Sequence, residues 1–359
     1  MPRLFLILHI LIAIGLQMTG YAYCLDPGTW GVLSLAGYAF PLFLVLSLLS
    51  LAVATCRYRS HLAVPFVSLV AAYNPVTLYC PVHTEQEVPE QAISVMTYNT
   101  HNWGMGDGAA SPSDDADGGR AVMQYIAQSG ADIVCLQESA LTAPRRQSLD
   151  SIMNTAYAYY DSVRSMTHAS LVIYSHFPIK RKQTIFYTEN GNGSAAFWLD
   201  VNGREVVVVN NHLQSTGLSV EDRNKFSDMV HGRNDTIKDI SRSVFSKLLH
   251  STRRRVPQAQ AVARFVNEQM AQGRPVIVCG DFNDIPHSYV HHVMAQDLTD
   301  CYQASATGPG YSFSRYGMRV RIDNVLCSPD ITPYNFRTDN TAPASDHYPV
   351  TGKVTFAAQ

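Results

Sequence analysis

Residues 276–284 read VIVCGDFND: an apolar, β-branched run, a glycine, and then two acids and an amide within four positions. A short continuous apolar run is typical of a strand buried in an α/β core, and Gly280 gives the backbone room to turn where the run ends. Asp281 and Asn283 are two residues apart, so an extended backbone points both side chains to one side and Phe282 into the packing. The stretch therefore predicts a buried strand with a polar end.

The polar end of this strand suits phosphoryl chemistry, because an acid can activate water while an amide steadies negative charge on a phosphate oxygen. The same residues also suit an Asx-turn, in which Asp281 and Asn283 only cap backbone groups. The stretch alone leaves both interpretations open.

Other apolar runs of the chain also end in polar residues. Strands are predicted at residues 93–99 (ISVMTYN), 132–137 (DIVCLQ), 171–174, 206–210, 321–326 (RIDNVL) and 350–356. Asn202–Gly203 predicts a hairpin between 197–201 and 204–209, and helical periodicity marks 120–128 and 256–272.

Eight polar residues lie at or beside the ends of these runs: Asn99, Glu138, His212, Asp281, Asn283, Asp323, Asp346 and His347. Each alone has a structural explanation as a strand cap or a turn former. Strand ends converge on one rim in α/β enzymes, and sites there are built from residues far apart in sequence. We therefore expect the eight side chains to share one pocket.

The N-terminal part of the chain holds three windows without Asp, Glu, Lys or Arg: residues 4–25, 27–56 and 60–84. A membrane span needs about 20 mostly apolar residues, so we expect three transmembrane helices near 4–23, 33–56 and 62–79. A cleaved signal peptide is the alternative for the first window. Pro65, Asn74 and Pro75 interrupt the third window, although membrane helices tolerate proline.

The cations around these windows predict an orientation. Arg3 precedes the first window, Arg57 and Arg59 lie between the second and third, and the loop at 26–29 has no cation. The positive-inside rule then puts the N-terminus and the 57–61 turn in the cytoplasm. We expect a multi-pass protein of the cell (inner) membrane whose C-terminal domain lies on the extracytoplasmic side. A transporter is not favoured, because the windows lack the charged residues that mark ion or substrate paths.

Composition adds few constraints on partners. The net charge is −2, and a nonspecific nucleic-acid binder usually has a basic face, which this chain lacks apart from residues 253–255. The seven cysteines show neither metal spacing nor a disulfide framework. Cys301 and Cys327 can pair in an oxidising compartment, but the sequence does not decide whether they do.

The motifs TYN, LQE, NHLQS, GDFND, RIDNVL and SDHYPV, in this order, resemble those of the endonuclease/exonuclease/phosphatase superfamily, which includes deoxyribonuclease I, and in particular its membrane-anchored bacterial members. The resemblance runs from about residue 93 to the C-terminus. It implies a four-layer α/β sandwich, two packed sheets flanked by helices, preceded here by an N-terminal transmembrane segment. We expect a membrane segment at 1–83, a linker at 84–92 and a catalytic domain at 93–359.

The resemblance also implies roles for the eight residues. Glu138 would be the principal metal ligand, with Asn99 and Asp346 near the same ion, and such oxygen ligands suit Mg²⁺ or Mn²⁺. Asp281 would orient or deprotonate the attacking water and Asn283 would donate to the phosphate. His347, held by Asp323, and His212 would contact the phosphate from opposite sides.

The implied activity is metal-dependent hydrolysis of a phosphate ester, from a nucleic acid or from a phospholipid or inositol phosphate; the sequence indicates no protein partner. Residues 166–170 offer only His168 where many relatives carry a basic or tyrosyl residue, and 190–197 (NGNGSAAF) lack the arginine of several nucleases. Both departures weaken the case for DNA-specific contacts. The alternative is a catalytically silent, membrane-tethered binding module of the same fold.

Overall fold

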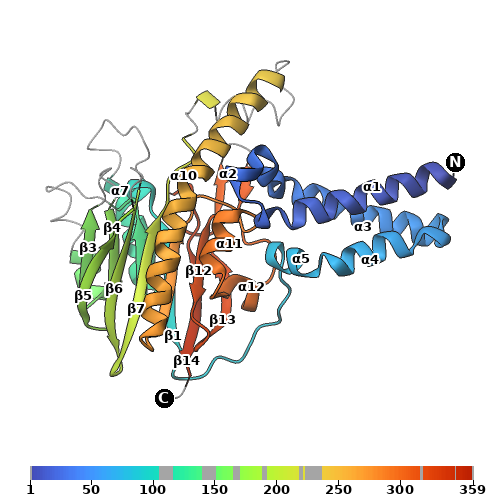
Figure 1. Ribbon diagram of the computed structural model, residues 1–359. Helices are drawn as coiled ribbons and strands as arrows, with labels where there is room; N and C mark the ends of the chain where they lie inside the picture. Colours follow the sequence, from blue (N-terminus) through green and yellow to red (C-terminus); the bar gives the residue numbers. More distant parts are fainter. Residues whose placement is uncertain are drawn as a thin grey trace.

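Two six-stranded sheets packed face to face form the centre of the computed structural model (Figure 1). The structure describes residues 2–104, 116–139, 151–164, 170–187, 192–217, 221–222, 237–315, 318–343 and 345–357. In order across the sheet, the first sheet contains β13 (Ile331–Thr338), β14 (Val350–Phe356), β1 (Ile93–Asn99), β2 (Ile133–Gln137), β4 (Ser170–Ser175) and β3 (Tyr159–Arg164). The second contains β5 (Ile179–Ile185), β6 (Gly193–Val201), β7 (Arg204–His212), β8 (Val276–Asp281), β12 (Asp323–Cys327) and β9 (Thr299–Asp300).

Helices cover the outer faces of both sheets. The first sheet carries α7 (Ala116–Ser129), and the second carries α10 (Ile237–Ala271) and α11 (Tyr289–Ala295). Ile277 and Cys279 of β8 pack between the sheets, whereas Val276 and Val278 pack toward α10. This alternation explains why the strand is apolar on both faces. The predicted four-layer α/β sandwich is confirmed.

Local predictions hold in most of the strands. Asn202 and Gly203 have φ values of 54° and 88° and close the hairpin between β6 and β7 as expected. The long helix differs, because α10 begins at Ile237 rather than at residue 256 and continues through Pro257. Arg255, two residues before that proline, is fully buried and bonded to Asp284. Tertiary contacts thus hold a turn that proline would otherwise weaken.

The N-terminal segment forms an arm that projects from the sandwich (Figure 1). It contains α1 (Pro2–Gly20), α2 (Pro27–Trp30), the 3-10 helix η2 (Gly31–Ala39), α3 (Phe40–Arg57), α4 (Ala63–Ala71) and α5 (Tyr73–Tyr79). Two stretches, 3–20 and 27–57, are long and apolar enough to cross a membrane. The third expected span is bent by 58° between α4 and α5. Pro75 explains the break, since its ring opposes the carbonyl of Ala71 four residues earlier.

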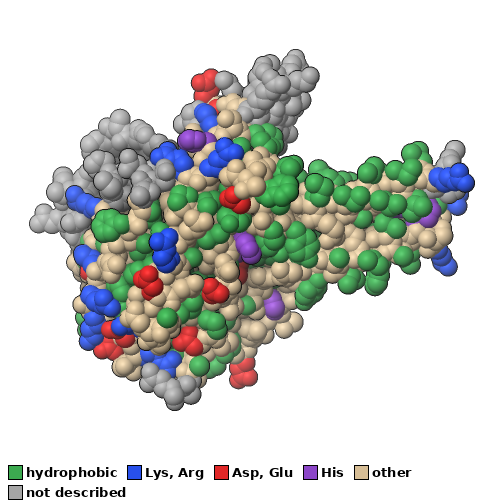
Figure 2. Space-filling model, in the orientation of Figure 1, with side chains coloured by type: hydrophobic (Ala, Val, Ile, Leu, Met, Phe, Trp, Pro, Cys, Tyr) green, Lys and Arg blue, Asp and Glu red, His purple; other side chains and the backbone are tan. Residues whose placement is uncertain are grey.

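Apolar side chains are spread along the visible surface of the arm, and cationic side chains gather at its far end (Figure 2). Leu4, Leu11, Leu42 and Val67 are among the large apolar residues that the described arm leaves more than half exposed. Such a surface is characteristic of helices that contact lipid rather than water. At the far end, Phe5 of α1 stacks on Tyr58, next to the last residue of α3.

The near end of the arm is packed on the sandwich. The Tyr38 hydroxyl donates to Asp284 Oδ1 at 3.2 Å, and His287 stacks on Phe40 with ring centroids 4.2 Å apart. Gly37 has no room for a side chain, because an added Cβ would lie 2.4 Å from the backbone oxygen of His287. The arm therefore contacts the loop that directly follows β8.

Candidate active site

The polar strand ends meet where the two sheets come together. In the second sheet, Asp281 is the register partner of both His212 on β7 and Asp323 on β12. In the first sheet, Asn99 ends β1 and donates through Nδ2 to Asp281 Oδ2 across the interface at 3.0 Å. One amide thus connects the two sheets at the point where the acids gather.

The turn after β8 is an Asx-turn that also presents a carboxylate oxygen to the site, so the two interpretations of the 276–284 sequence are compatible. The Asn283 N–H donates to Asp281 Oδ1 at 2.8 Å, which is an Asx-turn, while Asp281 Oδ2 remains directed at the other site residues. Gly280 has φ of 126°, and a Cβ there would lie 2.0 Å from the Asn211 carbonyl oxygen. Only glycine fits this backbone. The Asn283 side chain donates to the Leu213 carbonyl at 3.0 Å.

Glu138 lies directly beyond β2 on a left-handed backbone, with φ of 50°. Its Oε1 accepts from Asn99 Nδ2 at 3.3 Å and lies 3.4 Å from His212 Nε2. A quarter of its side chain is exposed, against 1% for Asp281. Among the carboxylates at this rim, Glu138 is accordingly well placed to meet an incoming ion.

His347 and Asp323 form a buried pair. His347 Nδ1 lies 2.8 Å from Asp323 Oδ2, so the imidazole donates to the carboxylate and directs Nε2 toward Asp281, 3.9 Å away. Burial lowers the pKa of His347, but the Asp323 and Asp281 carboxylates raise it, and the result is about 10. His347 is therefore protonated at neutral pH. Burial and the Asp323 carboxylate both raise the pKa of Asp281 above its usual range.

His212 is the neutral histidine of the site, because burial lowers its pKa to about 4. Its Nε2 lies 2.9 Å from Asn192 Nδ2. The same Nδ2 donates to the Leu213 carbonyl at 3.0 Å, which fixes the orientation of the amide, so Nε2 accepts a hydrogen bond. Asn192 was not predicted as a site residue, since it ends no apolar run.

Asp346 brings two further unpredicted residues to the rim. Its Oδ1 lies 3.3 Å from His101 Nδ1, and its Oδ2 lies 3.9 Å from Arg315 Nη1. Arg315 comes from a hairpin of β10 (Phe313–Arg315) and β11 (Met318–Val320), and Phe313 of this hairpin packs on the His347 ring. His101 lies two residues beyond β1 and follows the strand-end rule. Arg315 carries no such signal.

The structure thus gathers all eight expected residues around one rim. Side-chain atoms of three of them, Asp281, Asp323 and His347, lie within 4.8 Å of one another, and the two carboxylates can bind a cation while the protonated His347 cannot. Including Glu138 and Asp346, the rim holds four carboxylates against the buried imidazolium of His347 and the partly exposed guanidinium of Arg315, and the buried Asp323 Oδ1 lacks a hydrogen-bond partner in the described part of the chain. Such an excess of oxygen donors and negative charge fits a hard divalent cation.

The fold and the site define a hydrolase that acts on phosphate esters, and the sequence comparisons agree. The family model described as "Endonuclease/Exonuclease/phosphatase family" matches residues 96–347, and this chain belongs to that family. Its expected enzyme class, phosphoric ester hydrolase, follows from this membership. A second model, "Domain of unknown function (DUF8431)", matches residues 2–79.

Several solved structures resemble this one at low sequence identity. Truncated Caenorhabditis elegans TDP2 is 16% identical, with a TM-score of 0.49, 74% of this chain covered and 98% of that chain. Sphingomyelinase C from Streptomyces griseocarneus is 19% identical, with a TM-score of 0.49 and coverages of 74% and 99%. An endonuclease/exonuclease/phosphatase family protein from Bacteroides thetaiotaomicron is 18% identical, with a TM-score of 0.49 and coverages of 74% and 98%. No curated protein matches.

The departures noted in the sequence fall largely outside the described residues. Residues 165–169, which include His168, and residues 188–191 are not among the residues that the structure describes. Several nucleases were expected to carry an arginine somewhere in 190–197, and within the described part of this region Asn192 contacts His212.

Proposed function

We propose that this protein is a membrane-anchored, divalent-metal-dependent phosphoesterase that hydrolyses a phosphodiester by attack of water. The observation that carries the proposal is the cluster of Asp281, Asp323 and His347, connected through Asn99 to the more exposed Glu138. Phosphodiester hydrolysis needs a positive centre, a group that orients water and donors for the developing negative charge. The rim supplies candidates for each.

In this proposal Glu138, Asn99 and Asp346 hold the ion, which is Mg²⁺ or Mn²⁺ because the donors are oxygens. When bound, the ion supplies positive charge that neutralises a phosphate oxygen. Asn99 also holds Glu138 and Asp281 in place, since its Nδ2 donates to both carboxylates.

Asp281 orients the attacking water and accepts its proton. A raised pKa suits this role, because a carboxylate of ordinary acidity is a weak base. His347 donates from Nε2 to the phosphate, with its proton at Nδ1 held by Asp323. Asn283 donates a further hydrogen bond after its amide leaves the Leu213 carbonyl. His212 donates to the phosphate after Asn192 releases Nε2 and the imidazole proton moves from Nδ1 to Nε2.

The membrane placement belongs to the same proposal. The stretches 3–20 and 27–57, with the bent pair α4 and α5, anchor the protein as a multi-pass protein of the cell (inner) membrane. Arg3, Arg57 and Arg59 lie at the end of the arm away from the sandwich, which favours a cytoplasmic tip and an extracytoplasmic catalytic domain. The substrate is a phosphate ester of a nucleic acid, a phospholipid or an inositol phosphate.

Metal titration of the full-length protein in detergent tests the proposal. We expect calorimetric binding of Mg²⁺ or Mn²⁺ that Glu138→Ala abolishes, together with metal-dependent hydrolysis of a chromogenic phosphodiester. Glu268→Ala, an exposed acid on α10, is the matched control and should change neither measurement. Absence of binding at millimolar metal would leave the silent binding module as the better description.

A further inference from the structure

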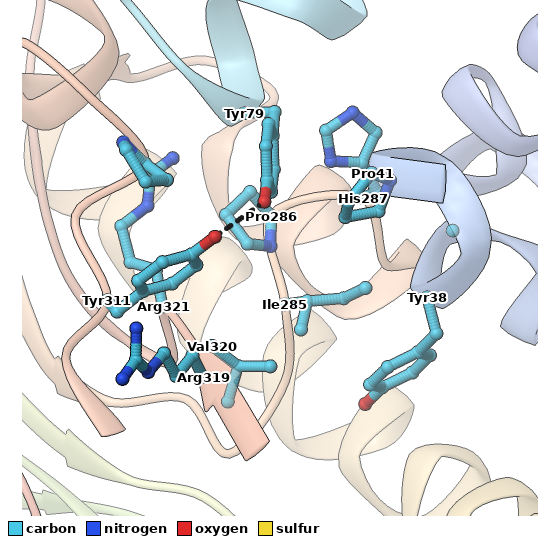
Figure 3. A pocket seen from close by; sticks show the side chains of 12 residues that line it. Tyr38, Pro41, Tyr79, Ile285, Pro286, His287, Tyr311, Arg319, Val320 and Arg321 are labelled. Carbon is cyan, nitrogen blue, oxygen red and sulfur yellow. Dashed lines mark hydrogen bonds between the residues drawn. The ribbon is translucent and has the colours of Figure 1, made fainter. Parts of the chain in front are cut away.

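A cavity lies between the arm and the sandwich, outside the rim of acids. The arm contributes Tyr38, Pro41 and Tyr79, and the sandwich contributes Tyr311, Arg319 and Arg321 among others. Tyr79 and Tyr311 meet with their hydroxyl oxygens 2.8 Å apart (Figure 3). The cavity holds about 490 Å³ of empty space, including its open mouth.

The position of this cavity corresponds to the level of lipid headgroups if the arm spans a membrane. Tyr38 and Pro41 lie on either side of the first residue of α3, and Tyr79 is the last residue of α5. Partly exposed Tyr21 and Trp30 lie at the same end of the arm, and Tyr and Trp are enriched where a membrane meets water. The helices beyond this level are apolar on their exposed sides.

Two arginines give the cavity its positive charge. Arg319 is exposed and has no hydrogen bond or ion pair with the described residues. Arg321 is 3% exposed; its Nη2 donates to the Leu78 carbonyl at 2.7 Å, while its buried Nε and Nη1 lack hydrogen-bond partners in the described chain. Asp300, 3.6 Å from Arg321 Nη2, balances one of the two charges. The excess cation is therefore Arg319.

We propose that this cavity binds the phosphate headgroup of an anionic phospholipid from the membrane leaflet that faces the catalytic domain. Arginine suits a phosphate, because its planar guanidinium offers several donors to phosphate oxygens. The tyrosine and proline side chains cover the glycerol end of the headgroup, and the acyl chains continue along the apolar side of the arm. The inference rests on the membrane placement proposed above but not on the hydrolytic activity.

The cavity also adjoins the active site through the chain. Ile285, Pro286 and His287 form part of its wall, two to four residues after Asn283. Arg319 belongs to the same β10–β11 hairpin as Arg315, whose guanidinium lies 3.9 Å from Asp346. A bound lipid therefore contacts both segments that connect the cavity to the rim of acids.

Native mass spectrometry of the full-length protein, delipidated in detergent and kept in EDTA to prevent turnover, tests this proposal. The probes are phosphatidylglycerol and phosphatidylcholine of identical acyl chains. We expect preferential binding of phosphatidylglycerol, weakened about tenfold by Arg319→Gln, the loss expected for one charge-assisted hydrogen bond, and partly restored by Arg319→Lys. Arg264→Gln, an exposed arginine on α10, is the control and should bind as the wild type does.

Other outcomes overturn the proposal. Equal binding of phosphatidylglycerol and phosphatidylcholine would mean that the site does not recognise an anionic headgroup. A loss of phosphatidylglycerol binding in Arg264→Gln as large as that in Arg319→Gln would mean the same. Equal competition by soluble glycerol phosphate would identify a small phosphate ester as the ligand. Glu138→Ala should bind phosphatidylglycerol normally, so failure of the hydrolase proposal leaves this result unchanged. Recovery of the protein in the soluble fraction of cells would remove the membrane placement itself.

Discussion

Asp281 and Asp300 are both buried carboxyl groups beside β12, yet their surroundings differ in charge. Asp281 faces Asp323, and burial together with that carboxylate raises its pKa. Burial also raises the pKa of Asp300, but Arg321 and His291 overcome it and bring the pKa to about 2. Asp300 additionally accepts from two backbone N–H groups at the start of α12 (Cys301–Ser305).

The difference separates a site that is arranged for chemistry from one that is arranged for stability. The rim near Asp281 keeps like charges together, at a cost to the folded state. The cluster around Asp300 combines opposite charges and caps a helix. Substitutions should therefore affect activity at the first site and stability at the second.

The largest effect is expected on activity at the rim. His347→Ala and Glu138→Gln should each lower kcat/KM for a chromogenic phosphodiester by ~10²-fold or more, because each removes a group proposed to meet the developing charge. The melting temperature of Glu138→Gln should stay near that of the wild type, because this side chain is partly exposed, whereas His347→Ala also leaves the buried Asp323 without its partner and should melt lower. Unchanged activity in both variants would show that the chemistry takes place elsewhere.

Asp300→Ala should give the largest loss of stability. The substitution leaves Arg321 buried without its counter-charge and removes the cap of α12, so we expect the free energy of unfolding to fall by ~3–5 kcal/mol. Chemical denaturation of the full-length protein in detergent measures the change. Asp297→Ala, three residues earlier and exposed, should stay within about 0.5 kcal/mol of the wild type. Similar losses in both variants would argue against the role given to Arg321.

Asp281→Asn should instead raise the free energy of unfolding. The amide oxygen can still accept from the Asn283 N–H, and although the new amide nitrogen loses the hydrogen bond from Asn99 Nδ2, one of the crowded negative charges disappears. We expect hydrolysis to be lost and the metal-free protein to gain about 1 kcal/mol in stability. Denaturation in EDTA checks this expectation, and a destabilised variant would mean that the Asp281 charge is balanced in the folded state.

The sequence predicted the sandwich best where strands are buried on both faces, because such strands are apolar throughout. The run at 276–278 and the hairpin around Asn202 are examples. Edge strands were missed: β3 reads YYDSVR and β5 reads IKRKQTI, and both are largely exposed. An edge strand buries too little surface to impose a hydrophobic pattern.

The site was predictable to the extent that it lies on strand ends. Asn99, Glu138 and His212 follow buried runs, so their convergence follows from the parallel pairing of β1 with β2 and of β7 with β8. Asn192 and Arg315 could not be predicted in this way. Their contacts depend on how a loop and a short hairpin fold back over the rim, which is decided by tertiary packing rather than by a local pattern.

The last expected effect is a dependence of stability on pH at the junction between the arm and the sandwich. Burial lowers the pKa of His287 to about 3, and its Nε2 lies 3.0 Å from the Pro75 carbonyl oxygen of the arm. The folded state thus binds fewer protons than the unfolded state between pH 6.5 and 3. The stabilisation is complete above pH 6.5 and is lost as the pH falls, by at most about 1.4 kcal/mol per unit.

His287→Gln should reduce this acid sensitivity, because glutamine does not titrate and its amide can still donate to the carbonyl of Pro75. Two site residues titrate over the same range: His212, with a pKa of about 4, acts in the same direction as His287, and Asp281, with its raised pKa, acts in the opposite one. Melting temperatures between pH 7 and 4.5 should therefore be compared in an Asp281→Asn background. Asp300 contributes only below about pH 4, as its carboxyl becomes protonated. An identical slope with and without His287 would show that the acid-sensitive contact lies elsewhere, with His212 as the first residue to replace.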